Sequence, residues 1–112
     1  MTGAGFAEPL EEGRTIPTYI ILGKWTDQGI RNVKEASKRE NALRELCEKH
    51  EARVKDVYRT LGRYDVVATV EAPNDVAISA IVYSLGSWGT IRTETLRVFT
   101  RQEADQSLAK MG

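Results

Sequence analysis

Two stretches of this chain are apolar at successive positions, and they constrain its fold more than any other feature. The first is Tyr19-Ile20-Ile21-Leu22, and the second is Val66-Val67-Ala68 with Val70. Strands with one face in water alternate apolar and polar residues, whereas strands covered on both faces read as continuous apolar runs. We therefore expect two central strands, at 17–23 and 64–71, in a sheet that is shielded on both sides.

The segment between these strands predicts a helix at 38–50 and then a strand at 52–61. Ser37 and Glu40 have the spacing of a capping box, in which each side chain bonds a backbone N–H near the other. Four residues that share one helix face follow, at Leu43, Leu46, Cys47 and His50. Gly62-Arg63 is then expected to form a tight turn into the strand at 64–71.

The second half of the chain repeats the helix and the strand. Asn74 and Asp75 are typical N-cap residues, and Gly86 is placed for a left-handed C-terminal cap. The last strand is expected at 90–99, with a bulge near Thr95 because its apolar residues change phase there. The order β-α-β-β-α-β predicts an α+β, ferredoxin-like fold, in which a four-stranded antiparallel sheet carries both helices on one face.

Two helices shield only one face of such a sheet, while the other face still carries apolar side chains from the central strands. The simplest cover is the same face of a second, identical chain. A chain of 112 residues hides only about 65% of its unfolded surface when it folds alone. We therefore expect a sheet-mediated homodimer or higher homo-oligomer.

The composition bounds the domains, the partners and the compartment. One domain is expected at 16–101, between a flexible arm at 1–15 and a polar C-terminal tail at 102–112, whose few apolar residues could support a short helix. Sixteen basic residues balance sixteen acidic ones, which argues against nucleic-acid and anionic-membrane partners. The start lacks the pattern of a signal peptide, no apolar run is long enough for a membrane span, and there is one cysteine, so we expect a cytoplasmic protein.

Four motifs follow one another in order between 16 and 99: Tyr19 to Ile30, Gly62-Arg63-Tyr64-Asp65, Val70-Glu71-Ala72-Pro73, and Gly86-Ser87-Trp88-Gly89 leading to Arg92-Thr93 and Thr95. This set resembles the GYD-domain family of small bacterial and archaeal proteins, named for the Gly-Tyr-Asp signature that is Gly62, Tyr64 and Asp65 here. The resemblance implies the fold and the sheet-to-sheet dimer of the dimeric α/β-barrel superfamily. That superfamily includes cofactor-independent monooxygenases, cyclases and isomerases as well as stress-response proteins, and the family itself implies no particular activity.

Tyr64 and Asp65 are candidates for chemistry because a phenol and a carboxylate at a cleft mouth could donate a hydrogen bond and take a proton. In the structural alternative, which we favour, Asp65 bonds turn backbone and Tyr64 packs over the sheet edge. On the last strand, Thr93 and Thr95 point one way and Arg92 the other. Arg92 could hold a carboxylate or enolate oxygen, or pair with an acid across the subunit interface.

Trp25 completes this candidate pocket, because aromatic walls with a few polar groups are typical of small-ligand sites. Trp25 and Trp88 could equally be core or interface anchors. His50 has no second histidine or cysteine at ligand spacing, so we expect no metal. The glycines at 86–89 follow a helix instead of preceding one, so we expect no phosphate cradle, and no cofactor is predicted.

Three functions remain open. The first is a small-ligand-binding or assembly module, the second is a cofactor-independent enzyme that uses Tyr64, Asp65 and Arg92 on a small organic substrate, and the third is a purely structural oligomer. We rank them in that order, and whether the chain is an enzyme stays undecided.

Overall fold

The structure of this chain is a computed structural model, and it describes residues 16–112. The arm expected at 1–15 lies outside the described residues. The elements in chain order are β1 (Thr18–Trp25), α2 (Asp27–Arg31), the 3₁₀ turn η1 (Val33–Glu35), α3 (Ala36–Lys49), β2 (Arg53–Arg59), β3 (Val66–Glu71), α4 (Asp75–Ser87), β4 (Ile91–Val98) and α5 (Arg101–Ala109). This confirms the β-α-β-β-α-β order and the α+β, ferredoxin-like fold.

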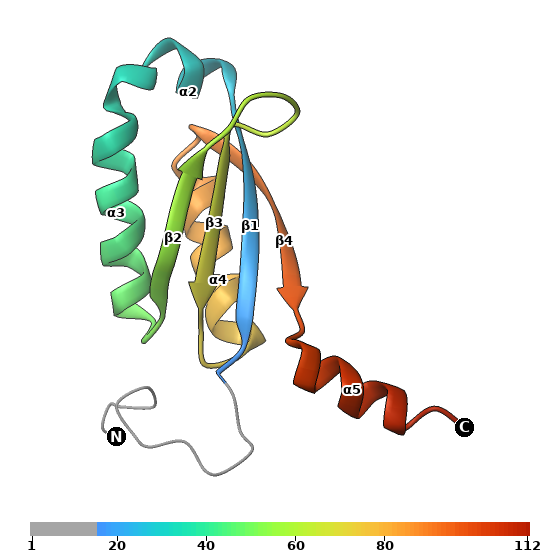
Figure 1. Cartoon of the computed structure of the whole chain (residues 1–112). Helices are drawn as coiled ribbons and strands as arrows, with labels where there is room; N and C mark the ends of the chain where they lie inside the picture. Colours follow the sequence, from blue (N-terminus) through green and yellow to red (C-terminus); the bar gives the residue numbers. More distant parts are fainter. Residues whose placement is uncertain (1–15) are drawn as a thin grey trace.

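The four strands form one antiparallel sheet in the order β2-β3-β1-β4 (Figure 1). The two continuous apolar runs are therefore the two central strands, as the sequence predicts. Because side chains alternate across a strand, Tyr19 and Ile21 of β1 share a face with their β3 partners Val70 and Ala68. Ile20 lies on the opposite face, together with the residues at the matching positions of the neighbouring strands.

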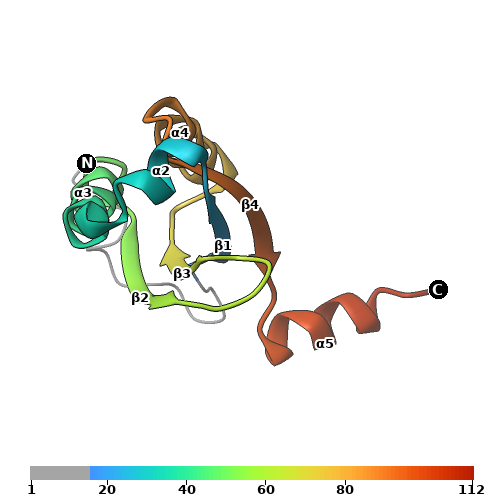
Figure 2. The same ribbon diagram turned by 90° about the horizontal axis from the view of Figure 1, so that it is seen from above.

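Helices α3 and α4 cover the first of these faces, and Figure 2 shows both of them on the same side of the sheet. Their apolar stripes bring Leu43 and Cys47 from α3, and Ile78, Ile81 and Leu85 from α4, into the core against the sheet. Val70, Cys47 and Ile81 are fully buried there. Asn74 caps α4 as predicted, since its side chain accepts a hydrogen bond from the Ala77 N–H at 2.9 Å.

Four local predictions are wrong. No Ser37–Glu40 capping box forms, because η1 turns the chain early and α3 begins at Ala36 with no side-chain cap at Glu35. Gly86 lies inside α4, and the left-handed glycine is Gly89, with φ of 80°. The register between β1 and β4 runs without a break, so β4 has no bulge; the irregularity is between β2 and β3 instead, at 54–56.

The fourth wrong prediction concerns the tight turn at Gly62-Arg63. β2 ends at Arg59 and β3 begins at Val66, which leaves a six-residue loop, 60–65, that extends beyond the sheet (Figure 1). Its base is closed by two hydrogen bonds from Thr60, one from its N–H to the Asp65 carbonyl and one from its hydroxyl to the Tyr64 carbonyl. Tyr64 and Asp65 therefore lie on a loop and not on a strand.

Candidate functional site

Loops from distant parts of the chain meet at the end of β1. The Thr26 hydroxyl donates to the Gly89 carbonyl at 2.7 Å, and the Thr26 N–H donates to the Thr90 carbonyl at 3.0 Å. The same hydroxyl accepts from the Gly29 N–H at 3.0 Å and so caps α2. One threonine thus joins the loop after β1 to the loop before β4.

Gly29 explains why this junction is so close. A Cβ atom at this position would lie 2.0 Å from the Thr90 carbonyl oxygen, which is far inside van der Waals contact. Only glycine lets the first turn of α2 rest against this backbone. Gly29 of the first sequence motif therefore allows the loop after β1 to pack on the loop before β4.

Asp65 ties the 60–65 loop to the same end of β1. Its carboxylate accepts a hydrogen bond from the Trp25 N–H at 2.9 Å, and its own N–H donates to the Gly23 carbonyl at 2.8 Å. A carboxylate that accepts from backbone N–H groups orders the chain around it. The Asp65 carboxylate thus bonds the backbone of β1, whereas its carbonyl accepts from Thr60 within its own loop.

Tyr64 lies on the face of the sheet away from helices α3 and α4. It lines a shallow depression with Leu22, Lys24, Arg92 and Glu94. Hydrogen bonding to the Glu94 carboxylate raises the pKa of the Tyr64 phenol. The signature residues Tyr64 and Asp65 therefore face different surroundings, although they are adjacent in sequence.

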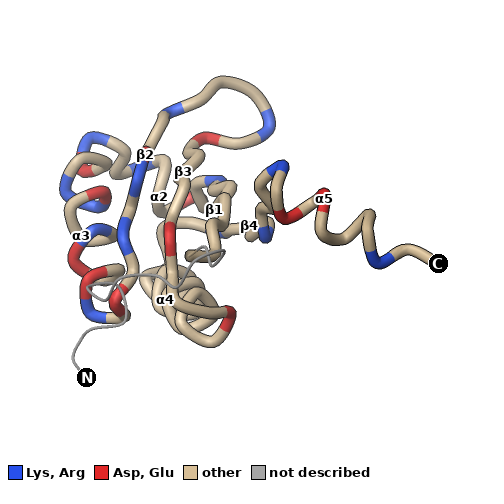
Figure 3. The backbone as a smooth tube through the Cα atoms, turned by 60° about the horizontal axis from the view of Figure 1, so that its bottom comes forward, with Lys and Arg blue, Asp and Glu red and all other residues tan. Residues whose placement is uncertain are grey.

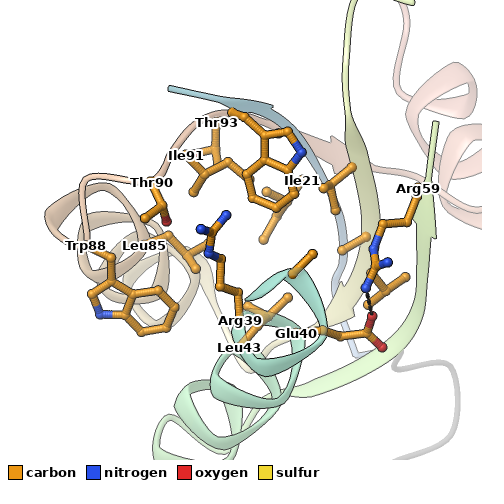
Figure 4. A pocket seen from close by; sticks show the side chains of 16 residues that line it. Ile21, Arg39, Glu40, Leu43, Arg59, Leu85, Trp88, Thr90, Ile91 and Thr93 are labelled. Atoms are coloured by element: carbon orange, nitrogen blue, oxygen red, sulfur yellow. Dashed lines mark hydrogen bonds and ion pairs between the residues drawn. The ribbon is translucent and has the colours of Figure 1, made fainter. Parts of the chain in front are cut away.

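A cleft opens between the sheet and the two helices beside this junction. It encloses about 560 Å³, a volume that includes solvent at its mouth, and most of its walls are apolar. β1 contributes Ile21 and Trp25, α3 contributes Leu43, and Leu85 and Trp88 come from the end of α4. Figure 4 shows these walls converging from both helices and the sheet on one space.

Arg39 of α3 reaches into this cleft (Figure 4). Its guanidinium lies 5.0 Å from the centre of the Trp25 ring and donates to the Gly29 carbonyl at 3.0 Å and to the Asn32 carbonyl at 2.8 Å. These contacts fix its position without neutralising it. Within residues 16–112, Arg39 makes no ion pair with a carboxylate.

A second set of charges borders the cleft at Glu40. Its carboxylate lies 3.4 Å from the Arg59 guanidinium of β2 and 3.3 Å from that of Arg44. One carboxylate is thus shared by two guanidinium groups, so the border of the cleft carries an excess of positive charge when Arg39 is added.

The six residues predicted to form one pocket lie on two sides of the sheet. Trp25 and Thr93 line the cleft. Thr95 lies on the same face of β4, where its hydroxyl is buried without a hydrogen-bond partner among residues 16–112. Tyr64 and Arg92 lie on the opposite side of the sheet. The predicted opposition of Arg92 to the two threonines is confirmed by the register of β1 with β4.

Arg39, Glu40 and Arg59 were missed as cleft residues. The sequence pattern does place Arg39 and Glu40 on the buried side of α3. They lie three and four residues after the buried Ala36, and four and three residues before the buried Leu43. Helix residues at those spacings share one face. Assuming a helix start at Lys38 removed the first turn from this pattern.

The face of the sheet that the helices leave uncovered is the second candidate site, and we call it the open face. Its central residues Ile20, Leu22 and Val67 are only half-buried. Leu96 of β4 is 47% exposed and Tyr58 of β2 is 60% exposed. Each of the four strands thus contributes an apolar side chain to a row on this face, and residues 16–112 provide no cover for it.

Helix α5 begins beside this sheet but does not cover it. Thr100 and Glu103 form a capping box, and Glu103 also lies 3.6 Å from the Arg97 guanidinium. The rest of α5 extends away from the body (Figures 1 and 2), and Leu108 and Met111 are exposed.

Residues 16–112 contain neither a metal-binding cluster nor a membrane-spanning helix. No group of three or more histidine, cysteine or carboxylate side chains in residues 16–112 could hold a metal ion. None of the helices in this part of the chain is both long and apolar enough to cross a membrane.

Comparison with known proteins identifies the family. The GYD domain family matches this chain over residues 19–108. A curated relative, the glutamine synthetase and cystathionine beta-lyase binding protein of Thermus thermophilus, is 34% identical over 82 residues, which cover 72% of this chain and 86% of the relative. The chain therefore belongs to the GYD domain family.

Proposed function

We propose that this GYD-domain protein is a small binding module for other proteins and that it assembles with copies of itself through the open face of its sheet. The observation that carries the proposal is the apolar row on that face, because the face of an antiparallel sheet that meets water ordinarily carries polar side chains, and an exposed apolar patch marks an interaction surface.

A second copy is the occupant that fits the open face. The row has few charges at its centre, where Leu22 pairs with Val67 of β3 and Ile20 pairs with Leu96 of β4. Charges of both signs border it, including Arg92 and Glu94 on the same face of β4. A face with an apolar centre and a rim of mixed charge can pair with itself about a two-fold axis.

The outer face of α4 is the surface that we assign to a partner protein. Val76 and Tyr83, which lie two turns apart on one side of the helix, are each 79% exposed. Asp75 is the only charged residue of α4, whereas α3 carries many charges of both signs (Figure 3). Interface centres are poor in charge and rich in aromatic residues. The Thermus relative is named for the two enzymes it binds, which supports a protein partner here.

Self-association is tested with Leu96→Asp, which places a carboxylate on the open face beside Ile20 of β1. We expect light scattering at micromolar concentration to show an oligomer for the wild type and a monomer for this variant. Val76→Asp is the matched control, since it adds the same charge to an exposed apolar position on α4 and should leave the oligomer intact. A monomeric wild type would contradict the proposal.

Partner binding is tested with glutamine synthetase and cystathionine β-lyase from the same organism as this chain, each immobilised for biolayer interferometry. We expect the wild type to bind at least one of them, and Tyr83→Asp to weaken that binding by tenfold or more without changing the oligomeric state. Asn41→Asp on α3 is the control for the added charge and should bind as the wild type does. Absence of binding to both enzymes would overturn this half of the proposal.

A further inference from the structure

The cleft between the sheet and the helices has an apolar interior and a positively charged border. We infer that it binds a small organic ligand with an apolar, ring-containing body and a carboxylate head, and that Arg39 holds the carboxylate. This inference goes beyond the proposed protein-binding function, because the cleft lies on the side of the sheet away from the open face.

The walls define the body of the ligand. Leu43, Leu85 and Ile91 present aliphatic surface, and Trp25 adds an aromatic ring. A flat apolar group can stack on that ring and exclude water from the aliphatic residues.

Arg39 defines the head. It is half-buried, it forms no ion pair within the described part of the chain, and two carbonyl groups and the Trp25 ring hold it in place. A guanidinium has five N–H donors in a fixed fork, so donors remain for a ligand after these two bonds. A carboxylate is the planar anion that fits this fork.

Arg59, the second arginine that lines the cleft, also favours a negatively charged ligand. Arg59 faces the cleft from β2 and pairs with Glu40 (Figure 4). Its charge is only partly compensated because Glu40 also pairs with Arg44. Glu40 repels anions, but two arginines, Arg39 and Arg59, line the cleft beside this single carboxylate. The electrostatic balance at the mouth therefore favours an anion over a cation or a neutral group.

The test compares 2-naphthoate with its neutral analogue 2-naphthamide by isothermal titration calorimetry on the full chain. We expect the acid to bind at least tenfold more tightly than the amide, since hydrogen bonds to a charged group add that much. Equal affinities would overturn the carboxylate assignment. Failure of both ligands to bind at millimolar concentration would overturn the site itself.

The location is checked with the indole N–H signals of Trp25 and Trp88, the only two tryptophans of the chain, both of which line the cleft. We expect both signals to shift in a ¹H–¹⁵N spectrum when 2-naphthoate is added, and Trp88→Phe assigns them. Binding that moves neither signal would place the ligand elsewhere and overturn the inference.

Arg39→Gln should remove the tenfold advantage of the acid while leaving the affinity for the amide unchanged. Retained amide binding shows that the cleft is still folded. If the amide is lost as well, Arg59→Gln serves instead and should weaken the acid several-fold but not the amide. Arg53→Gln is the matched control and should change neither affinity. Arg53 lies on β2 like Arg59, but on the face of the sheet away from the cleft, where it pairs with Glu71 at 2.7 Å. An unchanged preference for the acid in both Arg39→Gln and Arg59→Gln would overturn the role of the arginines.

Discussion

Val70 and Val67 lie three residues apart on β3, but their surroundings differ. Val70 faces the helices and is fully buried, whereas Val67 lies on the open face and is half-buried. The two faces of the sheet carry similar apolar residues, yet the single chain completes only one of them. The difference shows that apolar content alone does not define a core, because a second layer must also be present.

The largest contrast between the two faces is expected from shortening one side chain on each. Ile81→Ala removes a fully buried side chain of α4 that packs on the covered face, and should lower the free energy of unfolding by about 3–4 kcal/mol. Leu96→Ala on the half-exposed open face should cost less than about 1 kcal/mol in the monomer. Urea denaturation at submicromolar concentration measures both, and equal losses would mean that β4 is covered in the isolated chain.

The sequence predicted the covered face better than the open one, for a physical reason. Leu43, Cys47, Ile78 and Ile81 recur at helical spacing, so local periodicity identifies both the helix and the face it buries. Which side chains of β1 meet the helices depends on strand register and on helix placement, and neither is local. The existence of an uncovered face could be inferred, but the residues that form it could be named only from the pairing.

The candidate site shows the same limit. Asp65 contacts Trp25, which is forty positions away, and Thr26 contacts Gly89, which is sixty-three positions away. Four motifs in order signalled the family, but nothing in their spacing showed that three of them meet at one end of β1. Arg39 was overlooked because the boundary of α3 was placed two residues late, and boundaries depend on caps that tertiary contacts can override.

The two valines of β3 give a finer version of the comparison. Val70→Ala should cost about 2 kcal/mol at any protein concentration, because its cavity lies inside one chain. Val67→Ala should cost less than about 1 kcal/mol in the monomer, and more as protein concentration rises and the open face pairs. Thermal unfolding of both variants from 1 to 200 µM tests this, and a Val67→Ala effect independent of concentration would count against pairing through the open face.

The covered side of the sheet holds two side chains, Cys47 and Tyr19, whose pKa values are raised. Burial raises the pKa of the Cys47 thiol from 9.0 to about 11, and burial with the Asp75 hydrogen bond raises that of the Tyr19 phenol from 10.0 to about 12. Since both groups are kept neutral in the folded chain, their stabilisation is complete below pH 9 and is lost as the pH rises through these windows. For Cys47 the loss amounts to about 2 kcal/mol between pH 9 and 11.

Cys47→Ala should therefore flatten the decline in stability between pH 9 and 11, although it lowers stability at pH 7 by leaving a small cavity. Val67→Ala on the other side of the sheet is the comparison variant, because it removes no group that titrates, and it should keep the slope of the wild type. The measurement is the urea midpoint as a function of pH. Parallel curves for the wild type and Cys47→Ala would show that the thiol is not the group responsible.

The smallest expected effect concerns two helix caps of the same kind on helices with different packing. Asn74 caps α4, which belongs to the core, and Thr100 caps α5, which has no buried residue. Each cap is worth about 1 kcal/mol to its helix. Asn74→Ala should lower global stability by about that amount, because α4 unfolds with the whole domain.

Thr100→Ala should instead leave the global free energy of unfolding of the dilute monomer unchanged, because α5 can open while the sheet stays folded. Its amide protons should exchange about five times faster with solvent, as a loss of about 1 kcal/mol in local opening requires. Hydrogen exchange followed by mass spectrometry measures this on the peptide that contains 101–109. If Thr100→Ala lowered the global stability of the monomer as much as Asn74→Ala does, α5 would be part of the cooperative core despite its exposed surface.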